Sequence, residues 1–208
     1  MPDSEYAPHP VQPDVTAFIL TGGKSERMGQ DKALLRLPSG TTLIEHALGV
    51  ASAIAGQVGI DGPGERYAGY AWAGEFVQDI FPERGPLGGI HAALTTTTTE
   101  WNVILAVDLP RMTTDALRWM LSIARQSGAE VTVPDTSGQL HPLCGIYRKN
   151  FKARAEDALK QGKNKVAACF DPKSLRVVSE EEVRAGGFEP GIFINVNTAE
   201  EFQKLIEK

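Results

Sequence analysis

The sequence contains little cysteine and no long apolar run. Its 208 residues include two cysteines, Cys144 and Cys169, which lie far apart and have no metal-ligand spacing around them. We therefore expect two reduced thiols in a cytoplasmic protein, and neither a disulfide framework nor a zinc site. No apolar stretch is long enough to span a bilayer, so we expect no membrane association.

The N-terminus lacks the features of a signal peptide. Residues 1–14 include four prolines and several acids but no apolar core, which is untypical of a secretory signal. A polar, proline-rich terminus of this kind is typical of disorder. We therefore expect a disordered tail over residues 1–13 and one folded domain over residues 14–208.

Basic residues are not in surplus either. The chain has 21 Lys and Arg against 26 Asp and Glu, a net charge of −5, which argues against a nucleic-acid partner. The length and a hydrophobic content of 42% suit a single domain with a sizeable core. We find no internal repeat, no linker, and no Ser/His/Asp or Cys/His pattern typical of nucleophilic catalysis.

Strand-like and helix-like segments alternate along the chain. Apolar runs predict strands at 15–20, 57–60, 75–80, 101–110, 129–134, 140–149, 174–179 and at the start of 191–208. Helical patterns occupy 41–56 (ended by Gly56), part of 85–94, 113–128, 150–162 and the C-terminus. Pro142 places its strand at an edge or a bulge. The alternation predicts a single α/β domain, Rossmann-like, with a mainly parallel twisted sheet and helices on both faces.

Several polar or small residues stand at the ends of predicted strands. In such sheets ligands bind beyond the C-terminal ends of the strands, so residues there are candidates for one site. These candidates are Leu20, Thr21, Gly22, Asp61, Asp79, Asp108 and Asn195 to Asn197.

The segment after the first strand contains Gly-Gly-Lys-Ser, which looks like the end of an ATPase phosphate loop. That loop needs a glycine five positions earlier, where Phe18 stands, so the pattern is excluded. A dinucleotide fingerprint, Gly-x-Gly-x-x-Gly opening a helix, is not matched by glycines at 22, 23 and 29. Neither common phosphate motif therefore explains the segment.

What remains is Gly22-Gly23-x-Ser25-x-Arg27-Met28-Gly29-x-Asp31-Lys32. Adjacent glycines let the backbone pass close to a nucleotide, and successive loop amides can form an anion-binding nest. Arg27 and Lys32 supply positive charge for a triphosphate, with Lys32 placed to meet the α- and β-phosphates. The alternative, a glycine turn with solvated charges, does not explain so many specified positions at a strand end.

This segment resembles the signature of the molybdenum cofactor guanylyltransferases, the MobA-like branch of the nucleotidyltransferases. Three further stretches resemble motifs of the same family in the same order. They are Gly85-Pro-Leu-x-Gly89-Ile90, Asp108-Leu-Pro110 and Phe193-Ile-Asn195-Val-Asn197-Thr198. The resemblance extends over nearly the whole chain outside the tail.

The resemblance implies that GTP lies across the C-terminal edge of the sheet. Base and ribose would be lined by Leu20, Thr21 and Gly22, beside Gly23 and Ser25 of the loop, and Lys32 would contact the phosphates. Asp79 matches a position close to the nucleotide. Asp108 matches a Mg²⁺ ligand and Asn197 a position that completes the metal site; oxygen ligands without His or Cys suit Mg²⁺. Alternatively, Asp108 is only a cap or turn former before Pro110.

Two positions depart from the family pattern, and for Asp61 and His141 the sequence allows more than one role. Thr21 stands where the family usually has alanine, and Asp61 where an asparagine contacts the nucleotide. The Asp61 carboxylate could accept hydrogen bonds from guanine N1–H and its amino group, or it could be a loop acid with no ligand role. For the pterin substrate the candidates are Gly85, Pro86, Leu87, Gly89 and His141. His141 can equally be a half-buried structural residue.

The implied reaction is attack by the terminal phosphate of molybdenum-molybdopterin on the α-phosphorus of GTP, which expels pyrophosphate. A phosphate monoester is already largely dianionic at neutral pH, so no general base is needed. The catalytic residues would be Lys32, Arg27 and Asp108, with transient contacts to proteins that deliver molybdopterin or receive the dinucleotide. Alternatives are a cytidylyltransferase of the same pathway, another small-molecule-phosphate nucleotidyltransferase, or a catalytically silent nucleotide-binding module.

Overall fold

The structure is a computed structural model that describes residues 10–22, 31–62, 67, 75–196 and 201–202. Eight of its strands form one sheet, with the order β3-β2-β1-β4-β7-β5-β6 and β8 paired to β5. The strands are β1 (Gln12–Leu20), β2 (Ala55–Asp61), β3 (Glu75–Val77), β4 (Trp101–Ala106), β5 (Val131–Thr136), β6 (Gln139–Leu140), β7 (Cys144–Arg148) and β8 (Leu175–Val178).

The sheet is mixed but mostly parallel, as predicted. β3, β2, β1 and β4 run parallel to one another, and β8 runs parallel to β5. β7 is antiparallel to both of its neighbours, β4 and β5. Leu20 at the end of β1 is level with Asp61 of β2 and Ala106 of β4. Three strand ends therefore meet at the same edge of the sheet.

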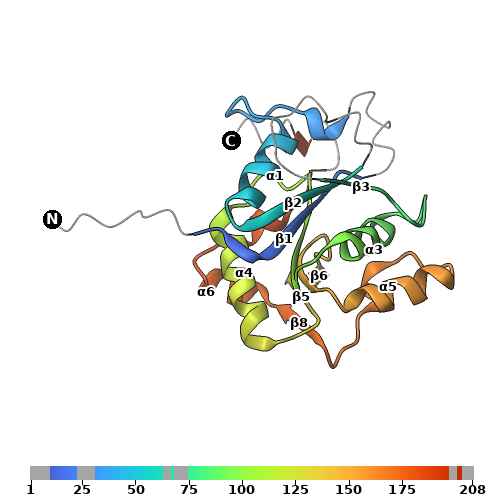
Figure 1. The fold of residues 1–208 in the computed structure, drawn as a ribbon. Coiled ribbons are helices and arrows are strands. Elements are labelled where there is room, and N and C mark those ends of the chain that lie inside the picture. Colours follow the sequence, from blue (N-terminus) through green and yellow to red (C-terminus); the bar gives the residue numbers. More distant parts are fainter. Residues whose placement is uncertain (1–9, 23–30, 63–66, 68–74, 197–200, 203–208) are drawn as a thin grey trace.

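Helices cover both faces of the sheet, which confirms the predicted α/β layers (Figure 1). One face carries α1, α4 and α6, and the other carries α3 and α5. The helices are α1 (Leu43–Ser52), α3 (Pro86–Thr96), α4 (Thr114–Ser127), α5 (Phe151–Lys160) and α6 (Glu180–Ala185), with 3-10 turns η2 (Lys32–Leu34), η3 (Val166–Cys169) and η4 (Pro190–Phe193).

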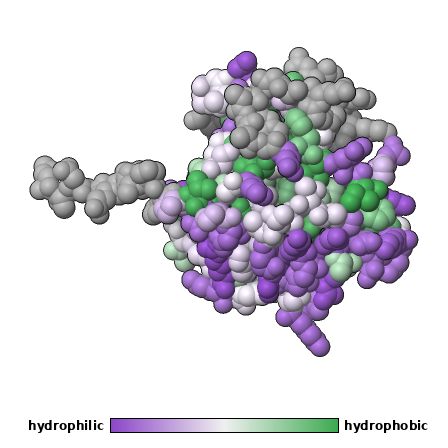
Figure 2. All heavy atoms as spheres, in the orientation of Figure 1, coloured by the Kyte–Doolittle hydropathy of each residue, from purple (hydrophilic) through white to green (hydrophobic). Residues whose placement is uncertain are grey.

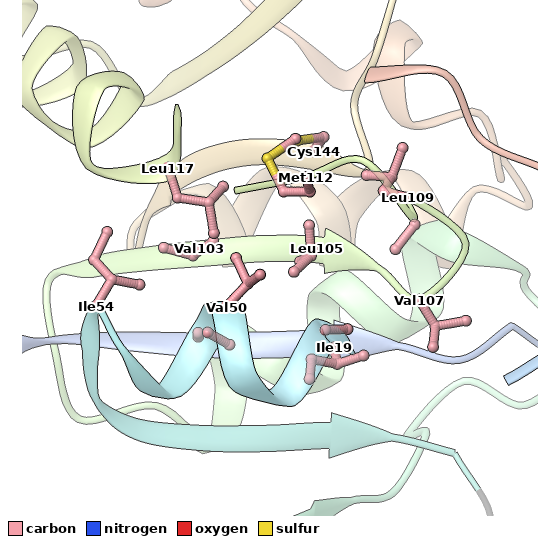
Figure 3. Close-up of a cluster of buried hydrophobic side chains, with 14 of the residues drawn as sticks. Ile19, Val50, Ile54, Val103, Leu105, Val107, Leu109, Met112, Leu117 and Cys144 are labelled. Carbon is pink, nitrogen blue, oxygen red and sulfur yellow. The ribbon is translucent and has the colours of Figure 1, made fainter. Parts of the chain in front are cut away.

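The central strands are buried on both faces. Successive side chains of a strand point to opposite faces, so Ile19 packs in the cluster under α1 and α4, whereas Phe18 packs in the cluster under α3 and α5. Figure 3 shows Ile19, Val103 and Leu105 close to Val50 of α1. This double burial explains why the strands read as continuous apolar runs.

The helix boundaries follow their capping residues. Thr42 and Glu45 form a capping box at the start of α1, and the Thr113 side chain accepts a hydrogen bond from Ala116 N–H at the start of α4. Gly128 ends α4 in the left-handed conformation, with φ 65°. These caps were readable in the sequence because they use ordinary capping chemistry.

Two predicted boundaries near the N-terminus were wrong. β1 begins at Gln12, so residues 12 and 13, which we assigned to the tail, belong to the sheet. Residues 1–9 lie outside the described part of the chain. Gly56 does not end α1, because it belongs to β2, where a Cβ would lie 2.9 Å from Pro13 Cα. Glycine is needed at this position because the neighbouring strand β1 packs closely against it.

Two predicted strands were also wrong. The segment 140–149 is two elements, β6 and β7, with Pro142 in the connection, and β7 lies inside the sheet rather than at its edge. The segment from residue 191 begins in the 3-10 turn η4 and not in a strand. Val196 N–H donates to the Asp108 carbonyl over 3.0 Å, so this segment runs beside the end of β4 without joining the sheet.

The surface seen in Figure 2 is mostly hydrophilic in its lower half, with hydrophobic side chains in small separate patches. The large hydrophobic side chains exposed among the described residues are Val11, Leu34, Phe76, Ile80 and Ile194. Within the same residues, none of the helices has the length and apolar character that crossing a membrane requires.

Candidate functional site

A cleft of about 720 Å³ opens at the C-terminal edge of the parallel strands. It lies where the chain order changes direction, since β1 is followed by β2 and β3 on one side and by β4 on the other. Ligands of open α/β sheets bind at such switch points. Its lining residues are Leu20, Thr21, Gly22, Lys32, Asp61, Asp79, Glu83, Gly85, Pro86, Ala106, Val107, Asp108 and Leu143.

Lys32 and Asp108 form an ion pair in the cleft. The Lys32 ammonium donates to Asp108 Oδ2 over 2.7 Å, and the two side chains are only 12% and 18% exposed. Lys32 is held by η2, whose N-cap is Asp31; the Asp31 side chain accepts from Ala33 N–H and from the Tyr67 hydroxyl. Asp31, a part of the motif without a role of its own in the sequence interpretation, therefore positions Lys32.

Asp108 has one carboxylate oxygen left for a ligand. Its Oδ1 is buried and has no hydrogen-bond partner among the described residues, although buried polar atoms are normally paired. A hard oxygen donor of this kind suits Mg²⁺, which takes one or two carboxylates together with substrate phosphates and water. In the described part of the chain, no three acidic, imidazole or thiol side chains converge into a metal site, so the remaining ligands would be such oxygens.

Asp61 and Asp79 lie on the other side of β1 from Asp108. Asp61 ends β2, and Asp79 follows β3, the next strand of the sheet. Burial, together with the nearby negative charge of Asp79, raises the pKa of Asp61 to about 7. Burial also raises the pKa of Asp79, whose Oδ1 has no hydrogen-bond partner in the described structure. The two carboxyl groups therefore hold a proton more readily than ordinary aspartates.

The first turn of α3 packs directly against these carboxyl groups. A Cβ on Gly89 would lie 2.2 Å from Asp61 Oδ2, and one on Gly88 would lie 3.4 Å from Asp79 Oδ1. Only glycine allows this approach. Gly85 precedes the helix with a φ of 61°, a conformation that also favours glycine, and it presents the N-terminus of α3 to the cleft.

Thr21 ties the ends of β1 and β2 together. Both its N–H and its hydroxyl donate to the Asp61 carbonyl, over 3.2 and 2.8 Å. Its hydroxyl therefore has a structural partner, which explains why threonine is accepted where alanine was expected. The bond also fixes the backbone from which the Asp61 side chain enters the cleft.

A second, smaller cavity of about 180 Å³ adjoins the cleft. It shares Asp108 and Leu143 with the cleft and is also lined by His141, Phe193 and Asn195. The His141 ring stacks on Phe193 with centroids 6.0 Å apart, and its Nε2 lies 2.6 Å from the Thr136 hydroxyl. Burial lowers the pKa of His141, so the imidazole is neutral at physiological pH. The partly exposed His141 ring, with the buried Phe193 packed on it, thus faces this cavity beside Asp108.

The structure brings most of the predicted residues into one site. Leu20, Thr21, Gly22, Lys32, Asp61, Asp79, Gly85, Pro86 and Asp108 all line the cleft, and His141 lines the adjoining cavity. Gly23, Ser25, Arg27 and Asn197 lie outside the described residues.

Two residues expected to contact the pterin do not line either cavity. The Leu87 side chain is fully buried in the core under α3, so it cannot reach a substrate. Gly89 is covered by the Asp61 carboxyl group. Both residues face the sheet rather than the cleft, because the helical turn that starts at Pro86 directs them that way. They support the site by packing and do not contact the substrate.

Glu83 was missed by the sequence interpretation. It lines the cleft and has a φ of 61°, unusual for a residue with a side chain. The available signal was its place two residues before Gly85, in a loop already assigned to the site. With Glu83 included, the described lining carries four carboxyl groups and one ammonium group.

Strand-end acids, a buried lysine and a helix N-terminus that meet at the switch point define an α/β nucleotide-binding enzyme. The comparisons with known proteins give the family. Residues 17–180 match the model of the MobA-like NTP transferase domain, and the chain belongs to this family of nucleotidyltransferases.

Relatives cover nearly the whole chain. A molybdenum cofactor guanylyltransferase from Syntrophotalea carbinolica is 30% identical over 189 residues, which are 91% of this chain and 89% of that protein. The crystal structure of molybdopterin-guanine dinucleotide biosynthesis protein A from Archaeoglobus fulgidus superposes with a TM-score of 0.78 at 25% identity and covers 92% of this chain and 97% of that one.

A more distant solved structure shares the fold. It is a Mycobacterium tuberculosis protein in complex with manganese, with a TM-score of 0.63 at 19% identity, covering 94% of this chain and 99% of that one. At this identity the likeness concerns the fold alone.

Proposed function

We propose that this protein is a molybdenum cofactor guanylyltransferase: it transfers GMP from GTP to the terminal phosphate of molybdenum-molybdopterin and releases pyrophosphate. The observation that supports this activity most directly is the Lys32–Asp108 ion pair at the switch point of the sheet, in a chain of the MobA-like family. Near-full-length relatives with this activity in their names support the choice of substrates.

The reaction requires the protein mainly to position two substrates and to neutralise their negative charge. The attacking phosphate monoester is already largely dianionic near neutral pH, since its second pKa is about 6. The protein must therefore hold two polyanions in line and reduce their repulsion. In our proposal Lys32 leaves Asp108 Oδ2 to bind the phosphates, and Arg27 of the same sequence motif assists the departing pyrophosphate.

Asp108 is the residue proposed to hold Mg²⁺, through its unpartnered Oδ1 and the Oδ2 that Lys32 vacates. Asn197 is proposed as a further ligand. Mg²⁺ bound there would neutralise charge on the α- and β-phosphates. The excess of carboxyl groups in the described lining supports this need, because a triphosphate would otherwise face a cleft of its own sign.

The pterin side of the site is proposed to be the small cavity beside Asp108. The His141 ring is partly exposed and is backed by the buried Phe193 ring, and we propose that a flat heterocycle packs against it. The cavity shares Asp108 with the nucleotide cleft, so a phosphate attached to a ligand there lies near the phosphates of GTP. Gly85 and Pro86, which line the nucleotide cleft, are proposed to contact the same substrate.

We further propose a cytoplasmic enzyme without a nucleic-acid partner, which meets molybdopterin-delivering and acceptor proteins only transiently. The experiment for the function itself uses the purified full chain with molybdenum-molybdopterin, Mg²⁺ and each of the four NTPs. Pyrophosphate release that needs both the pterin and GTP is the expected result. Release with CTP in place of GTP would overturn the proposal in favour of a cytidylyltransferase, and no release with any NTP would favour a silent binding module.

A further inference from the structure

Positive charge is concentrated in one segment of this acidic chain, residues 148–176, which holds α5, η3 and their connections. The segment contains nine Lys and Arg residues against three Asp and Glu residues, whereas the whole chain has 21 against 26. Its formal charge is therefore +6, and the rest of the chain carries −11. A patch of this kind produces a local positive potential that attracts negatively charged partners.

Four of the nine basic side chains are used inside the protein. They form ion pairs, namely Arg148 with Glu100, Arg154 with Glu130 and Asp171, Lys160 with Glu156, and Arg176 with Glu182. The other five make no side-chain hydrogen bond or ion pair with the residues that the structure describes. They are Lys149, Lys152, Lys163, Lys165 and Lys173, all exposed except the half-buried Lys152. These five charges are available to a partner.

β7 and α5 bring two of these lysines towards the cleft. β7 is antiparallel to β4 and runs from the cleft edge, next to Leu143, to the opposite edge at Arg148. α5 follows it and packs in the same cluster as α3. The ten residues of α5 rise about 15 Å, close to the roughly 17 Å of the five-residue β7. α5 therefore leads back to the cleft edge (Figure 1), and Lys163 and Lys165 follow its end.

Lys149 and Lys173 lie at the opposite edge of the sheet. Lys149 directly follows β7. Lys173 precedes β8, which begins level with Val131, and Val131 is paired with Tyr147 near the end of β7. The segment thus has one pair of free lysines towards the cleft and a second pair away from it.

The end of α5 lies on the side of the site that is proposed for the pterin. Phe151 of α5 packs against Tyr147 of β7, the strand next to β4. The residues just before β7, including His141, line the small cavity beside Asp108. β2 and β3 lie on the other side of β4, beyond β1. Lys163 and Lys165 are therefore nearer to the small cavity than to the strand ends of β2 and β3.

This basic surface has no apolar anchor. The structure describes residues 148–176 throughout, and none of the exposed large hydrophobic side chains belongs to them. Figure 2 shows mostly hydrophilic side chains over α5, at the lower right. Permanent interfaces are rich in apolar contacts, whereas complementary charges mainly accelerate encounters and make them sensitive to salt. The surface therefore fits a partner that binds transiently.

We propose that Lys163 and Lys165, at the end of α5, dock an acidic face of the protein that delivers molybdenum-molybdopterin, so that the pterin is transferred directly to the cavity beside Asp108. The proposal rests on the proposed function, which makes molybdenum-molybdopterin a substrate. A protein fits this surface better than a nucleic acid, because a long phosphate backbone would also meet the −11 of the rest of the chain.

The test supplies molybdenum-molybdopterin either free or bound to its purified delivering protein, with the full chain, Mg²⁺ and GTP. The variant is Lys163→Glu/Lys165→Glu. Its matched control, Lys149→Glu/Lys173→Glu, makes the same change in net charge at the opposite edge. With delivered pterin, kcat/KM of the variant should fall about 10-fold or more at low salt, a loss within the range of electrostatic steering. The control should stay close to wild type, and with free pterin all three proteins should have similar rates.

A second readout does not depend on activity. Surface plasmon resonance without GTP measures association between the full chain and the loaded delivering protein. Association of the wild type should slow steeply as salt is raised, because salt screens charges at an exposed surface. Association of Lys163→Glu/Lys165→Glu should be slower at low salt and depend less on salt. Thermal melting checks the fold of each variant, and the salt dependence of the wild type needs no variant.

Equal losses with free and delivered pterin would mean that the two lysines bind the substrate itself, which would overturn the docking role and leave the proposed function intact. Equal losses in the variant and the control would assign the effect to net charge and would overturn it as well. Wild-type association that does not depend on salt would have the same consequence. Failure of the wild type to transfer GMP even to free pterin would remove the proposed function, and this proposal with it.

Discussion

Lys32 and Asp108, which are 76 positions apart in the chain, are joined by a hydrogen-bonded ion pair of 2.7 Å at the switch point of the sheet. In the structure the cation proposed for the phosphates thus pairs with the carboxylate proposed for the metal. Each group keeps the other oriented and partly neutralised. Nucleotide and metal must separate the pair, so their binding is expected to be coupled.

The first prediction concerns turnover. Replacing Lys32 or Asp108 by Ala should lower the rate of guanylyl transfer by about 100-fold or more, because each removes a charge aimed at the reacting phosphates. Pyrophosphate release measures the rate, and circular dichroism and thermal melting check the fold. Lys149→Ala, a change at an exposed lysine far from the cleft, should have no effect. Near-normal transfer by Asp108→Ala would refute its assigned role.

The second prediction concerns metal binding without nucleotide. Lys32→Gln should raise the affinity of the free protein for Mn²⁺ several-fold, because the competing ammonium no longer occupies Asp108 Oδ2. Free Mn²⁺ is measured by electron paramagnetic resonance, which does not depend on activity. Asp108→Asn should bind less Mn²⁺ than wild type. Weaker binding by Lys32→Gln than by wild type would contradict competition between the ammonium and the metal.

The sequence predicted the parts of the site that strand ends determine. Leu20, Asp61 and Asp108 follow apolar runs of parallel strands, and parallel strands bring their C-terminal ends to one edge. The capped helices were predictable for a similar reason, since capping residues act locally.

The errors arose where tertiary packing decides. Nothing local distinguishes β7 as a central antiparallel strand, because its place is set by pairing with β4 and β5. Leu87 was assigned to a ligand loop, yet the helical turn after Gly85 directs it into the core. The contact between Gly89 and Asp61 joins residues 28 positions apart, and no spacing rule predicts it.

The third prediction tests that contact. In Gly89→Ala the new Cβ would lie 2.2 Å from Asp61 Oδ2, so the carboxyl group must rotate away. The protein should stay folded, because only the end of a side chain moves, but GTP affinity should fall about 10-fold or more. Calorimetry measures the affinity and thermal melting the stability.

Gly49→Ala in α1 is the matched control for this change. It is exposed, and a Cβ there meets nothing within 4 Å. The substitution should raise stability by about 0.5–1 kcal/mol through helix propensity and leave GTP binding unchanged. If Gly89→Ala binds GTP as tightly as Gly49→Ala does, the position of the Asp61 carboxyl group does not matter for binding.

The fourth prediction concerns the pH dependence of stability. The pKa of Asp61 is about 7 in the folded protein and about 4 in an unfolded chain. Between these values the folded state holds a proton that the unfolded state has lost, so this group's contribution to stability falls as pH rises from about 4 to 7. Above pH 7 the folded state carries a buried carboxylate that the unfolded state exposes to water. Asp61→Asn removes this cost.

The free energy of unfolding of the Asp61→Asn variant should therefore match that of wild type near pH 4.5. At pH 8 it should exceed that of wild type by on the order of 2 kcal/mol. Urea denaturation of the nucleotide-free protein at several pH values measures the difference. Subtracting the two curves cancels the titrating groups that do not interact with Asp61, such as the ion-paired Glu182, whose lowered pKa of about 2 acts in the opposite direction. A difference that does not change with pH would mean that Asp61 is already ionised at pH 5 and that the cleft is more hydrated than its burial indicates.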